Sequence, residues 1–328
     1  MSGSSSTLTI VVIGANGYSG RALLRLAAHQ PATYSIRAQV REPGTVLDAD
    51  NIRTFTGSLE QINPELFPDE PHILVHMAGK NIDHDGTGFE RVNIHGTENL
   101  LAHCNQHTLG ILYHSSLSVL GQNHQRNVSN QQTPSPKTDL ARSRAGAEQR
   151  VLDFAMKHNK SAYCLRPRFI LGKEDAFVIP ALIKLVQKGL YIGDGQQQFS
   201  VIDVDDYALL ILELCHRLYT CAEPERLALN VGYQKPLSFS HMYEALQTLD
   251  PSAHIKRRIT HPGALATSFN WLPVKKLRSL ATQLQLIGLD HYSDVSETRK
   301  RLRSDILNRD SFDYFRELAQ HFKDSSCN

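Results

Sequence analysis

The chain has 328 residues, of which 41% are apolar and 21% are charged. A chain of this length can bury a large core, and its length predicts about two domains. Lys and Arg number 35 against 33 Asp and Glu, and this near balance predicts no nucleic-acid partner. Since no apolar stretch reaches the roughly 18 residues of a membrane span, we expect no membrane partner.

The N-terminal residues 1–6 lack the charge and the apolar core of a signal peptide, which favours a cytoplasmic protein. The five cysteines form no C-x-x-C pair, so reduced thiols are the simplest interpretation. The sixteen histidines show no zinc spacing. Residues 83–86 resemble the start of a calcium loop but lack its later Glu. No metal site is predicted.

The first predicted element is a strand at residues 10–13, which runs into Gly14, Gly17 and Gly20. A helical pattern follows at residues 21–27. Strand, glycine turn and helix N-terminus predict a site for the pyrophosphate of a dinucleotide, because the helix presents free N–H groups and a positive dipole end. Gly14 would permit the turn, Gly17 the approach of the phosphates, and Gly20 close packing of the helix. An ordinary tight turn is the alternative.

Strands and helices then alternate. Strands are predicted at residues 35–40, 73–77 and 109–115, and helices at 89–104 and 145–158. The polar run from Asn123 to Pro136 is typical of a surface loop. This alternation predicts an α/β fold, a Rossmann-type doubly wound parallel sheet with helices on both faces.

Beyond residue 171 the alternation is less regular. Helices are predicted at residues 177–188, 205–218 and 238–249, with a strand at 228–231. Residues 293–322 have helical spacing, and the arginines between 299 and 303 predict a solvated helix face. We therefore expect a dinucleotide-binding domain in residues 1–170 and a smaller substrate lobe in residues 171–328. One or two returning segments of the lobe would be interleaved with the sheet.

Arg41 ends the segment that contains the second strand. An acid at this position would hold the ribose 2′-hydroxyl of NAD, whereas a base favours the extra phosphate of NADP. Glu42 follows directly, so NAD stays possible. We expect NADP; a plain surface arginine is the alternative.

Six segments together carry a family resemblance. In chain order they are GANGYSG (14–20), HILVHMAG (72–79), FERVNIHGTENLLAHC (89–104), ILYHSSLSVLG (111–121), AYCLRPRFILG (162–172) and GDGQQQFSVIDVDDYA (193–208). Through them the chain resembles the extended short-chain dehydrogenase/reductase superfamily, specifically its NAD-dependent epimerase/dehydratase group. The resemblance covers nearly the whole chain.

The resemblance implies a cofactor site and a small-molecule substrate, either a carbonyl compound or a nucleotide sugar. It leaves a homodimer open. The cofactor-binding residues that it implies are Gly14, Asn16, Gly17, Tyr18, Gly20, Arg41, Ser58, Leu59, Ala78, Gly79, Arg144 and Pro167.

The chain departs from the family at the catalytic pair Y-x-x-x-K. Leu140 stands at the Tyr position and Arg144 at the Lys position, and no Tyr occurs between residues 113 and 163. Leucine cannot transfer a proton. Arg144 keeps the charge that would hold the ribose but will not act as a base. Ser58 replaces the Asp that usually faces the adenine, which weakens the expected adenine contact.

Ser116 is the remaining catalytic candidate, because the family serine at this position donates a hydrogen bond to the substrate carbonyl. A local role at the strand end is the alternative, and Ser118 is a weaker candidate. Lys80, Asp83 or His84 could replace the missing proton donor, although a solvated loop is expected there. His114 fits a core histidine with satisfied bonds.

Two functions follow from this sequence. The first is an atypical NAD(P)-dependent oxidoreductase or epimerase with a non-standard proton donor. The second is a non-catalytic NAD(P)-binding sensor or assembly protein, as in the NmrA-like branch of the superfamily. The apparently complete substrate lobe favours the enzyme, and the loss of both Tyr and Lys favours the sensor.

Overall fold

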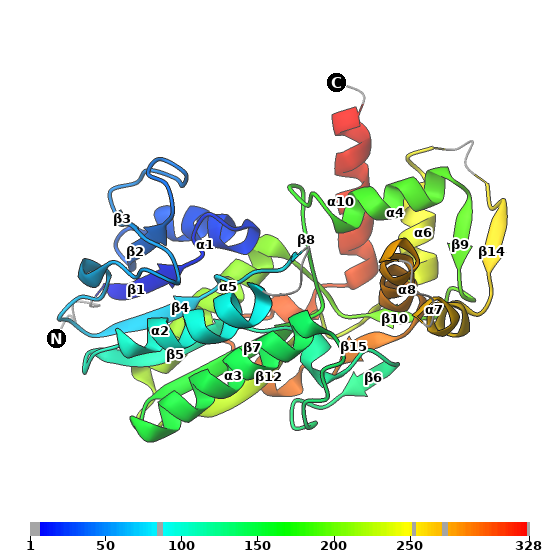
Figure 1. Ribbon diagram of the computed structural model, residues 1–328. Coiled ribbons are helices and arrows are strands. Elements are labelled where there is room, and N and C mark those ends of the chain that lie inside the picture. Colours follow the sequence, from blue (N-terminus) through cyan, green and yellow to red (C-terminus); the bar gives the residue numbers. More distant parts are fainter. Residues whose placement is uncertain (1–6, 84–87, 251–253, 271–274, 327–328) are drawn as a thin grey trace.

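A seven-stranded sheet forms the centre of the protein (Figure 1). The computed structural model describes residues 7–83, 88–250, 254–270 and 275–326. The strand order is β12-β7-β5-β4-β1-β2-β3, and every pair is parallel. The strands are β1 (Leu8–Ile13), β2 (Tyr34–Val40), β3 (Ile52–Thr56), β4 (His72–His76), β5 (Thr108–His114), β7 (Ser161–Pro167) and β12 (Arg226–Val231). The predicted Rossmann-type fold is confirmed, with the reversal of strand order at β1.

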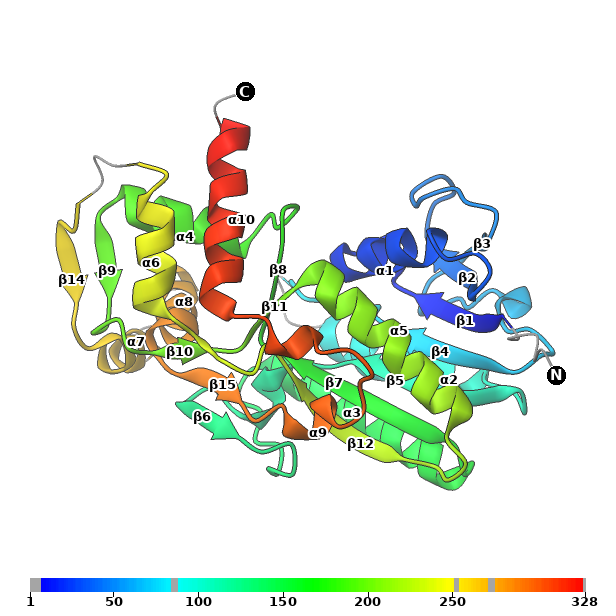
Figure 2. The same cartoon turned by 180° about the vertical axis from the view of Figure 1, so that it is seen from behind.

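Helices cover both faces of this sheet, as expected for parallel strands. The face toward the viewer in Figure 1 carries α2 (Gly96–Ala102) and α3 (Asp139–Lys157). The opposite face, seen in Figure 2, carries α1 (Tyr18–Ala28) and α5 (Val204–Thr220). Successive strand residues serve different faces: Val11 belongs to the core under α3 and Val12 to the core under α1 and α5. The packing of helices on both faces of the sheet therefore fixes the positions of the polar groups at the strand ends.

The other elements form a smaller lobe beyond the carboxyl ends of the strands. It contains a sheet of order β13-β10-β15-β6 and the strand pairs β11-β8 and β14-β9. Its strands are β6 (Gln125–Val128), β8 (Phe169–Leu171), β9 (Leu190–Ile192), β10 (Gln198–Phe199), β11 (Val201–Asp203), β13 (Leu237–Ser238), β14 (Arg257–Ile259) and β15 (His291–Ser293). Its helices are α4 (Val178–Gln187), α6 (Phe239–Gln247), α7 (Pro262–Asn270), α8 (Lys275–Gly288) and α10 (Ser311–Ser326). The short helix α9 (Ser296–Arg299) instead packs against β12 of the main sheet (Figure 2).

The late segments α5 and β12 lie on and in the main sheet rather than in the lobe. Helix α5 begins where Asp203 caps the amides of Asp205 and Asp206, at 2.8 and 3.4 Å. The two acidic residues occupy the first turn of this helix, where its dipole favours negative charge. The domain boundary near residue 170 stays a prediction.

Local patterns misplaced several elements. The predicted polar loop at residues 123–136 contains β6, which pairs with β15 through His291 and Gln125. The predicted helix at residues 89–104 begins with a π-helical segment, Glu90–His95, before α2. Strand β3 was not predicted, and α3 begins at Asp139, six residues before the expected start at Ala145. The partner of β6 lies far along the chain, beyond the reach of a local pattern.

The predicted solvated helix face at residues 299–303 is confirmed only in part, since Arg299, Lys300 and Arg303 are exposed. Helix α9 ends at Arg299, and the side chain of Arg301 is only 15% exposed. Arg301 pairs with Glu225 at 2.8 Å and with Glu297 at 2.9 Å. This arginine therefore fastens the C-terminal segment to the edge of the sheet.

Among the described residues, no helix combines the length and the apolar content needed to cross a bilayer. Within the same residues, no group of three or more His, Cys, Asp or Glu side chains is arranged to hold a metal ion. The four cysteines that the structure describes are free thiols.

Candidate cofactor and active site

The glycine turn lies where β1 passes into α1. Gly14 has φ +89°, and a Cβ there would come within 2.6 Å of the backbone nitrogen of Ala78. A Cβ on Gly20 would come within 2.3 Å of the carbonyl oxygen of Gly14. Both positions therefore need glycine for the fold itself, before any ligand binds.

Gly17 differs from the other two glycines. It is exposed and caps α1, and a Cβ there would meet only the Gly14 oxygen, at 3.2 Å. Arg21 is the first residue of α1 whose amide bonds to Gly17. The amides of the preceding turn have no acceptor within the helix, so they can bind an anion in the open space above Gly17. This cradle fits a dinucleotide pyrophosphate.

Tyr18 and Asn16 flank this glycine. The Tyr18 hydroxyl is buried without a hydrogen-bond partner among the described residues, and a Cβ on Gly172 would come within 2.6 Å of it. Tyr18 therefore packs under the turn against the loop after β8. Asn16 is half-buried, and its carbonyl oxygen accepts a hydrogen bond from Arg21 at 3.1 Å.

Arg41 follows β2 directly and is exposed, with no ion pair to the described residues. The neighbouring loop is fixed by Gln39, which is buried and donates to the carbonyl oxygen of Ser58 at 3.1 Å. The Ser58 hydroxyl accepts the amides of Glu60 and Gln61, both at 3.2 Å. The Ser58 hydroxyl oxygen thus closes a local turn by accepting these two hydrogen bonds.

Asn93 connects the end of β4 to α3. Its amide side chain accepts from the Lys80 backbone N–H at 2.7 Å and donates to the Ser143 hydroxyl at 2.9 Å. A Cβ on Gly79 would come within 3.1 Å of the Asn93 side-chain oxygen, so the segment Ala78–Gly79 must pass close to it. Leu59 is buried and packs beneath α2 against Gly96.

Leu140 and Arg144 are four residues apart on α3 and therefore share one helix face. Thr138 caps this helix by accepting the amide of Ala141 at 3.2 Å. Leu140 is half-buried, and Arg144 is 8% exposed. Both residues lie in the first turns of α3, ahead of the start at Ala145 that the local pattern predicted for this helix.

The Arg144 guanidinium reaches the ends of two strands. It donates to the carbonyl oxygen of His114 at 2.7 Å, and its other terminal nitrogen binds the Asn81 side chain. Gly79 lies beside it, with a Cβ position 3.9 Å from that nitrogen. A fixed positive charge therefore stands where β4 and β5 end.

Ser116 follows β5 and caps the short helical turn Leu117–Leu120. Its hydroxyl oxygen accepts the amide of Ser118 at 3.2 Å and the hydroxyl of Ser118 at 2.9 Å. Two accepted bonds leave the proton of Ser116 available for another acceptor. Ser116 therefore caps this turn, and the cap orients the Ser116 hydroxyl.

Lys80 and Asp83 form an ion pair at 2.5 Å, and the Asp83 side chain is only 3% exposed. Asp83 also accepts the amide of Gly88 at 2.6 Å. This pair is therefore committed to holding its own loop together. His84 lies outside the described residues.

His114 is the last residue of β5 and is half-buried. Its Nδ1 lies 2.9 Å from the hydroxyl of Tyr207 on α5, and the two rings meet edge to face. Burial, and then the charge of Arg144, lower the pKa of His114 to about 3. The ring is neutral at pH 7, and among the described residues its Nε2 has no hydrogen-bond partner.

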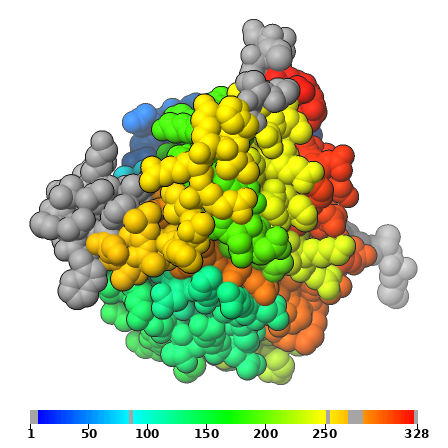
Figure 3. Space-filling view, turned by 90° about the vertical axis from the view of Figure 1, so that its right-hand side faces the viewer, coloured from blue at the N-terminus to red at the C-terminus, as the bar shows by residue number. Residues whose placement is uncertain are grey.

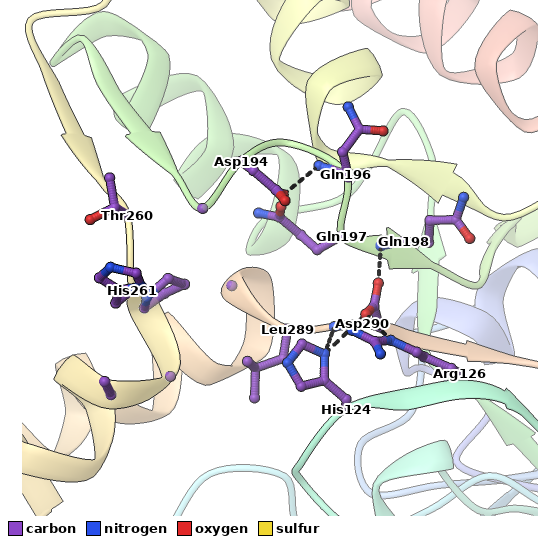
Figure 4. Close-up of a pocket in the computed structure, with 15 residues that line it drawn as sticks. His124, Arg126, Asp194, Gln196, Gln197, Gln198, Thr260, His261, Leu289 and Asp290 are labelled. Atoms are coloured by element: carbon purple, nitrogen blue, oxygen red, sulfur yellow. Dashed lines mark hydrogen bonds and ion pairs between the residues drawn. The ribbon is translucent and has the colours of Figure 1, made fainter.

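A pocket of about 560 Å³ lies in the lobe and includes none of these residues (Figure 4). Asp290 organises it by accepting from Arg126 at 2.6 Å and from the Gln198 amide at 2.9 Å. In Figure 3 the teal segment around β6 lies below the yellow-to-orange segment around β14 and α7. No sequence pattern pointed to this pocket, because its walls come from four distant segments.

Pro167 ends β7 and is buried. Next to it is Arg168, which the sequence did not single out and whose Nε is buried without a hydrogen-bond partner. Ser115 joins β5 to β7 by donating its amide to Leu165 at 2.8 Å. The glycine turn, Arg144, Ser116, His114 and Arg168 therefore all lie at the carboxyl edge of one sheet, the usual place for ligands in this architecture.

Comparison with known proteins matches residues 10–232 to the NAD dependent epimerase/dehydratase family. A sterol-4-alpha-carboxylate 3-dehydrogenase (decarboxylating) of Candida albicans is 25% identical over 60% of this chain and 61% of its own length. A 2-alkyl-3-oxoalkanoate reductase of Stenotrophomonas maltophilia is 26% identical over 62% of this chain and 63% of its own length. The chain thus spans about three fifths of these curated relatives.

Solved structures extend the likeness over nearly the whole chain. A UDP-glucuronic acid 4-epimerase from Bacillus cereus, solved with UDP-glucuronic acid and NAD, has a TM-score of 0.74 at 16% identity, covering 97% of this chain and all of its own. A UDP-N-acetylglucosamine 4-epimerase from Methanobrevibacter ruminantium has a TM-score of 0.73 at 16% identity, covering 97% and 99%. This likeness shows a shared fold. Together with the family match, it establishes that the chain belongs to the NAD-dependent epimerase/dehydratase family of extended short-chain dehydrogenases/reductases.

Proposed function

We propose that the protein is an NAD(P)-dependent oxidoreductase that acts at a carbonyl or hydroxyl carbon of a small molecule. The observation that carries this proposal is the convergence of the glycine turn, Arg144 and Ser116 at one sheet edge. When bound, the nicotinamide exchanges a hydride with the substrate carbon. The remaining roles belong to residues of this chain.

Cofactor binding in this proposal uses the residues that the family resemblance indicates. The amides above Gly17 hold the pyrophosphate, and Arg144 holds the nicotinamide ribose. Arg41 binds the 2′-phosphate of NADP, because it is exposed and unpaired among the described residues. Ser58 and Leu59 border the adenine, and Ala78, Gly79 and Pro167 border the rest of the dinucleotide.

The face of α3 lacks the family's acid/base. Leu140 offers no proton, and loss of such a group typically lowers the rate by roughly 10²- to 10⁴-fold. Lys80 and Asp83 are occupied with each other. We infer that the substrate oxygen is instead bound by neutral donors, the Ser116 hydroxyl and Nε2–H of His114.

The low pKa of His114 supports this role. Tyr207 can donate its hydroxyl proton to Nδ1, which places the remaining ring proton on Nε2. A neutral imidazole then polarises the carbonyl as a hydrogen-bond donor without titrating near pH 7. In a reduction, the bound substrate oxygen would take up from solvent the proton that completes the reaction.

The relatives differ in substrate. Both curated relatives are named for chemistry at a carbon next to one that bears a carboxylate. The structural neighbours bind nucleotide sugars. Because the curated relatives share more sequence with this chain, we favour a carbonyl or hydroxy acid over a nucleotide sugar.

A panel of hydroxy acids, ketones and nucleotide sugars tests the function, with NAD(P)H absorbance for redox turnover and product analysis for epimerisation. We expect turnover of at least one hydroxy acid or ketone, lowered in both Ser116→Ala and His114→Phe with unchanged cofactor affinity. Ser129→Ala is the matched control, because Ser129 is exposed and its hydroxyl accepts the amide of Gln131 in its own loop. No turnover of any compound by a protein that binds cofactor would favour the non-catalytic sensor, which the loss of Tyr and Lys supports.

A further inference from the structure

Arg168 stands between two strands at the centre of the molecule. It follows Pro167, the last residue of β7, and precedes Phe169, the first residue of β8. The chain passes here from the main sheet into the lobe. The backbone at this point lies beside the end of β5, since β5 and β7 are paired in the sheet.

The guanidinium of Arg168 lacks the partners that its neighbour has. Arg166 is 3% exposed and forms a buried ion pair with Glu148, with a further bond to the carbonyl oxygen of Asn130 at 3.2 Å. Arg168 makes no ion pair or hydrogen bond through its guanidinium with the described residues, and its Nε is buried. Its guanidinium carbon lies over the ring of Phe169, 5.4 Å from the ring centroid.

The electrostatics agree with an isolated charge. Burial alone lowers the pKa of Arg168 to about 10, and no carboxylate offsets it. The group stays protonated at neutral pH. His291 is the other titratable group that senses it, but both ring nitrogens of His291 are occupied, by Gln125 and by the Gln285 carbonyl, each at 2.9 Å.

Arg168 is half-buried as a residue, and its Nε is buried without a partner among the described residues. A partly desolvated positive charge without a counterion is unfavourable, so an anionic ligand would stabilise this arrangement. We propose that Arg168 binds the carboxylate of the substrate. This inference rests on the proposed function and names its substrate class: hydroxy or oxo acids with an apolar body. The planar guanidinium suits a carboxylate, which it can bind through two parallel hydrogen bonds.

The surroundings favour one small anion on an apolar molecule. Phe169 is 7% exposed, Phe199 is fully buried, and their rings lie 5.7 Å apart. A nucleotide diphosphate is the other anion that Arg168 could bind, but it would present several charged oxygens to a single arginine. The diphosphate is therefore an outcome of the test.

The test measures dissociation constants for 3-hydroxyoctanoate, its methyl ester and UDP on the full-length protein with bound NADP⁺. The acid and the ester share an apolar chain and differ in charge. We expect wild type to bind the acid roughly 10- to 100-fold more tightly than the ester, the usual strength of a charge-assisted contact. Arg168→Met should abolish this preference, and Arg168→Lys should retain part of it.

Arg142→Met is the matched control, because Arg142 is exposed and pairs with Asp139 on α3. It should leave the preference unchanged. Equal binding of acid and ester by wild type, or an acid preference that survives Arg168→Met, would overturn the proposal. Loss of UDP binding alone in Arg168→Met would assign Arg168 to a diphosphate instead.

The experiments distinguish failure of the role proposed for Arg168 from failure of the proposed oxidoreductase function. Turnover of neutral ketones without acid preference would keep the oxidoreductase and reject the role of Arg168. If no cofactor binds, the oxidoreductase fails, and the same acid–ester comparison on the free protein still decides Arg168. If Arg168→Met does not fold, the comparison of wild type with Arg168→Lys decides it.

Discussion

Arg144 illustrates how one residue change alters a site. A lysine at this position would bring a single point charge, whereas the guanidinium reaches His114 on one side and Asn81 on the other. The same charge helps to hold the pKa of His76 and of His114 near 3, after the larger effect of burial. Both imidazoles are therefore neutral at pH 7, which is the state that the proposed donor role of His114 requires.

We propose that another single residue, Arg41, sets the choice of cofactor. We expect wild type to bind NADP(H) more tightly than NAD(H), and Arg41→Ala to weaken NADP(H) by about 1–3 kcal/mol, the strength of an arginine–phosphate contact. Affinity for NAD(H) should not change, because NAD lacks the phosphate. Titration calorimetry with both cofactors checks this.

Arg53→Ala is the control for that experiment, since Arg53 is exposed on the neighbouring strand and stacks over Phe55. It should affect neither cofactor. Equal affinities for the two cofactors in wild type would remove the role assigned to Arg41.

At the scale of elements, the unit of β1, glycine turn and α1 contains two kinds of glycine, those that the fold requires and one that a ligand explains better. Gly14 and Gly20 are required by backbone contacts within the turn, at 2.6 and 2.3 Å for the added Cβ. Gly17 has open space apart from the Gly14 oxygen, at 3.2 Å, and an ordinary extended backbone with φ −72°. Its glycine is explained better by a ligand than by the fold.

Gly17→Val should therefore fold normally and fail to bind cofactor at concentrations that saturate wild type. The thermal unfolding midpoint should stay close to that of wild type, whereas Gly20→Val should lower it strongly. Fluorescence of bound NADPH and calorimetric melting distinguish the two effects. Wild-type affinity in Gly17→Val would show that the phosphates bind elsewhere.

For the whole molecule, Glu225 is the point at which distant segments join. It binds Arg217 of α5, Tyr163 of β7 at 2.7 Å and Arg301 of the C-terminal segment at 2.8 Å. Burial raises the pKa of Glu225, but the bonds from these three groups outweigh it and lower the pKa to about 2. The carboxylate is thus more stable in the folded chain than in the unfolded one.

This shift predicts acid sensitivity. A depressed carboxylate pKa stabilises the folded state above the ordinary value of 4.5, and the stabilisation is lost as pH falls from 4.5 to about 2. We expect Glu225→Gln to lower the free energy of unfolding by about 1–3 kcal/mol at pH 7 and by less at pH 3. Urea titrations at both pH values measure this, and an equal loss at both would contradict the linkage.

Local sequence determined the parts of this protein that depend on near neighbours. The apolar run of β1 and the glycines after it could be predicted, because strand propensity and positive φ act within a few residues. Helix α3 could be predicted only in part, since it begins six residues before its expected start. The site residues on α3 and after β5 could be placed by motif, but their hydrogen-bond partners could not.

Tertiary structure decided the rest. The pairing of Gln125 with His291, the packing of Arg301 against Glu225 and the position of Arg168 without a counterion all depend on segments far apart in the chain. Whether an arginine is solvated, paired or isolated follows from which distant residues surround it, and burial then shifts its pKa. That information arises only when the chain folds, because desolvation and ion pairing are properties of the assembled environment.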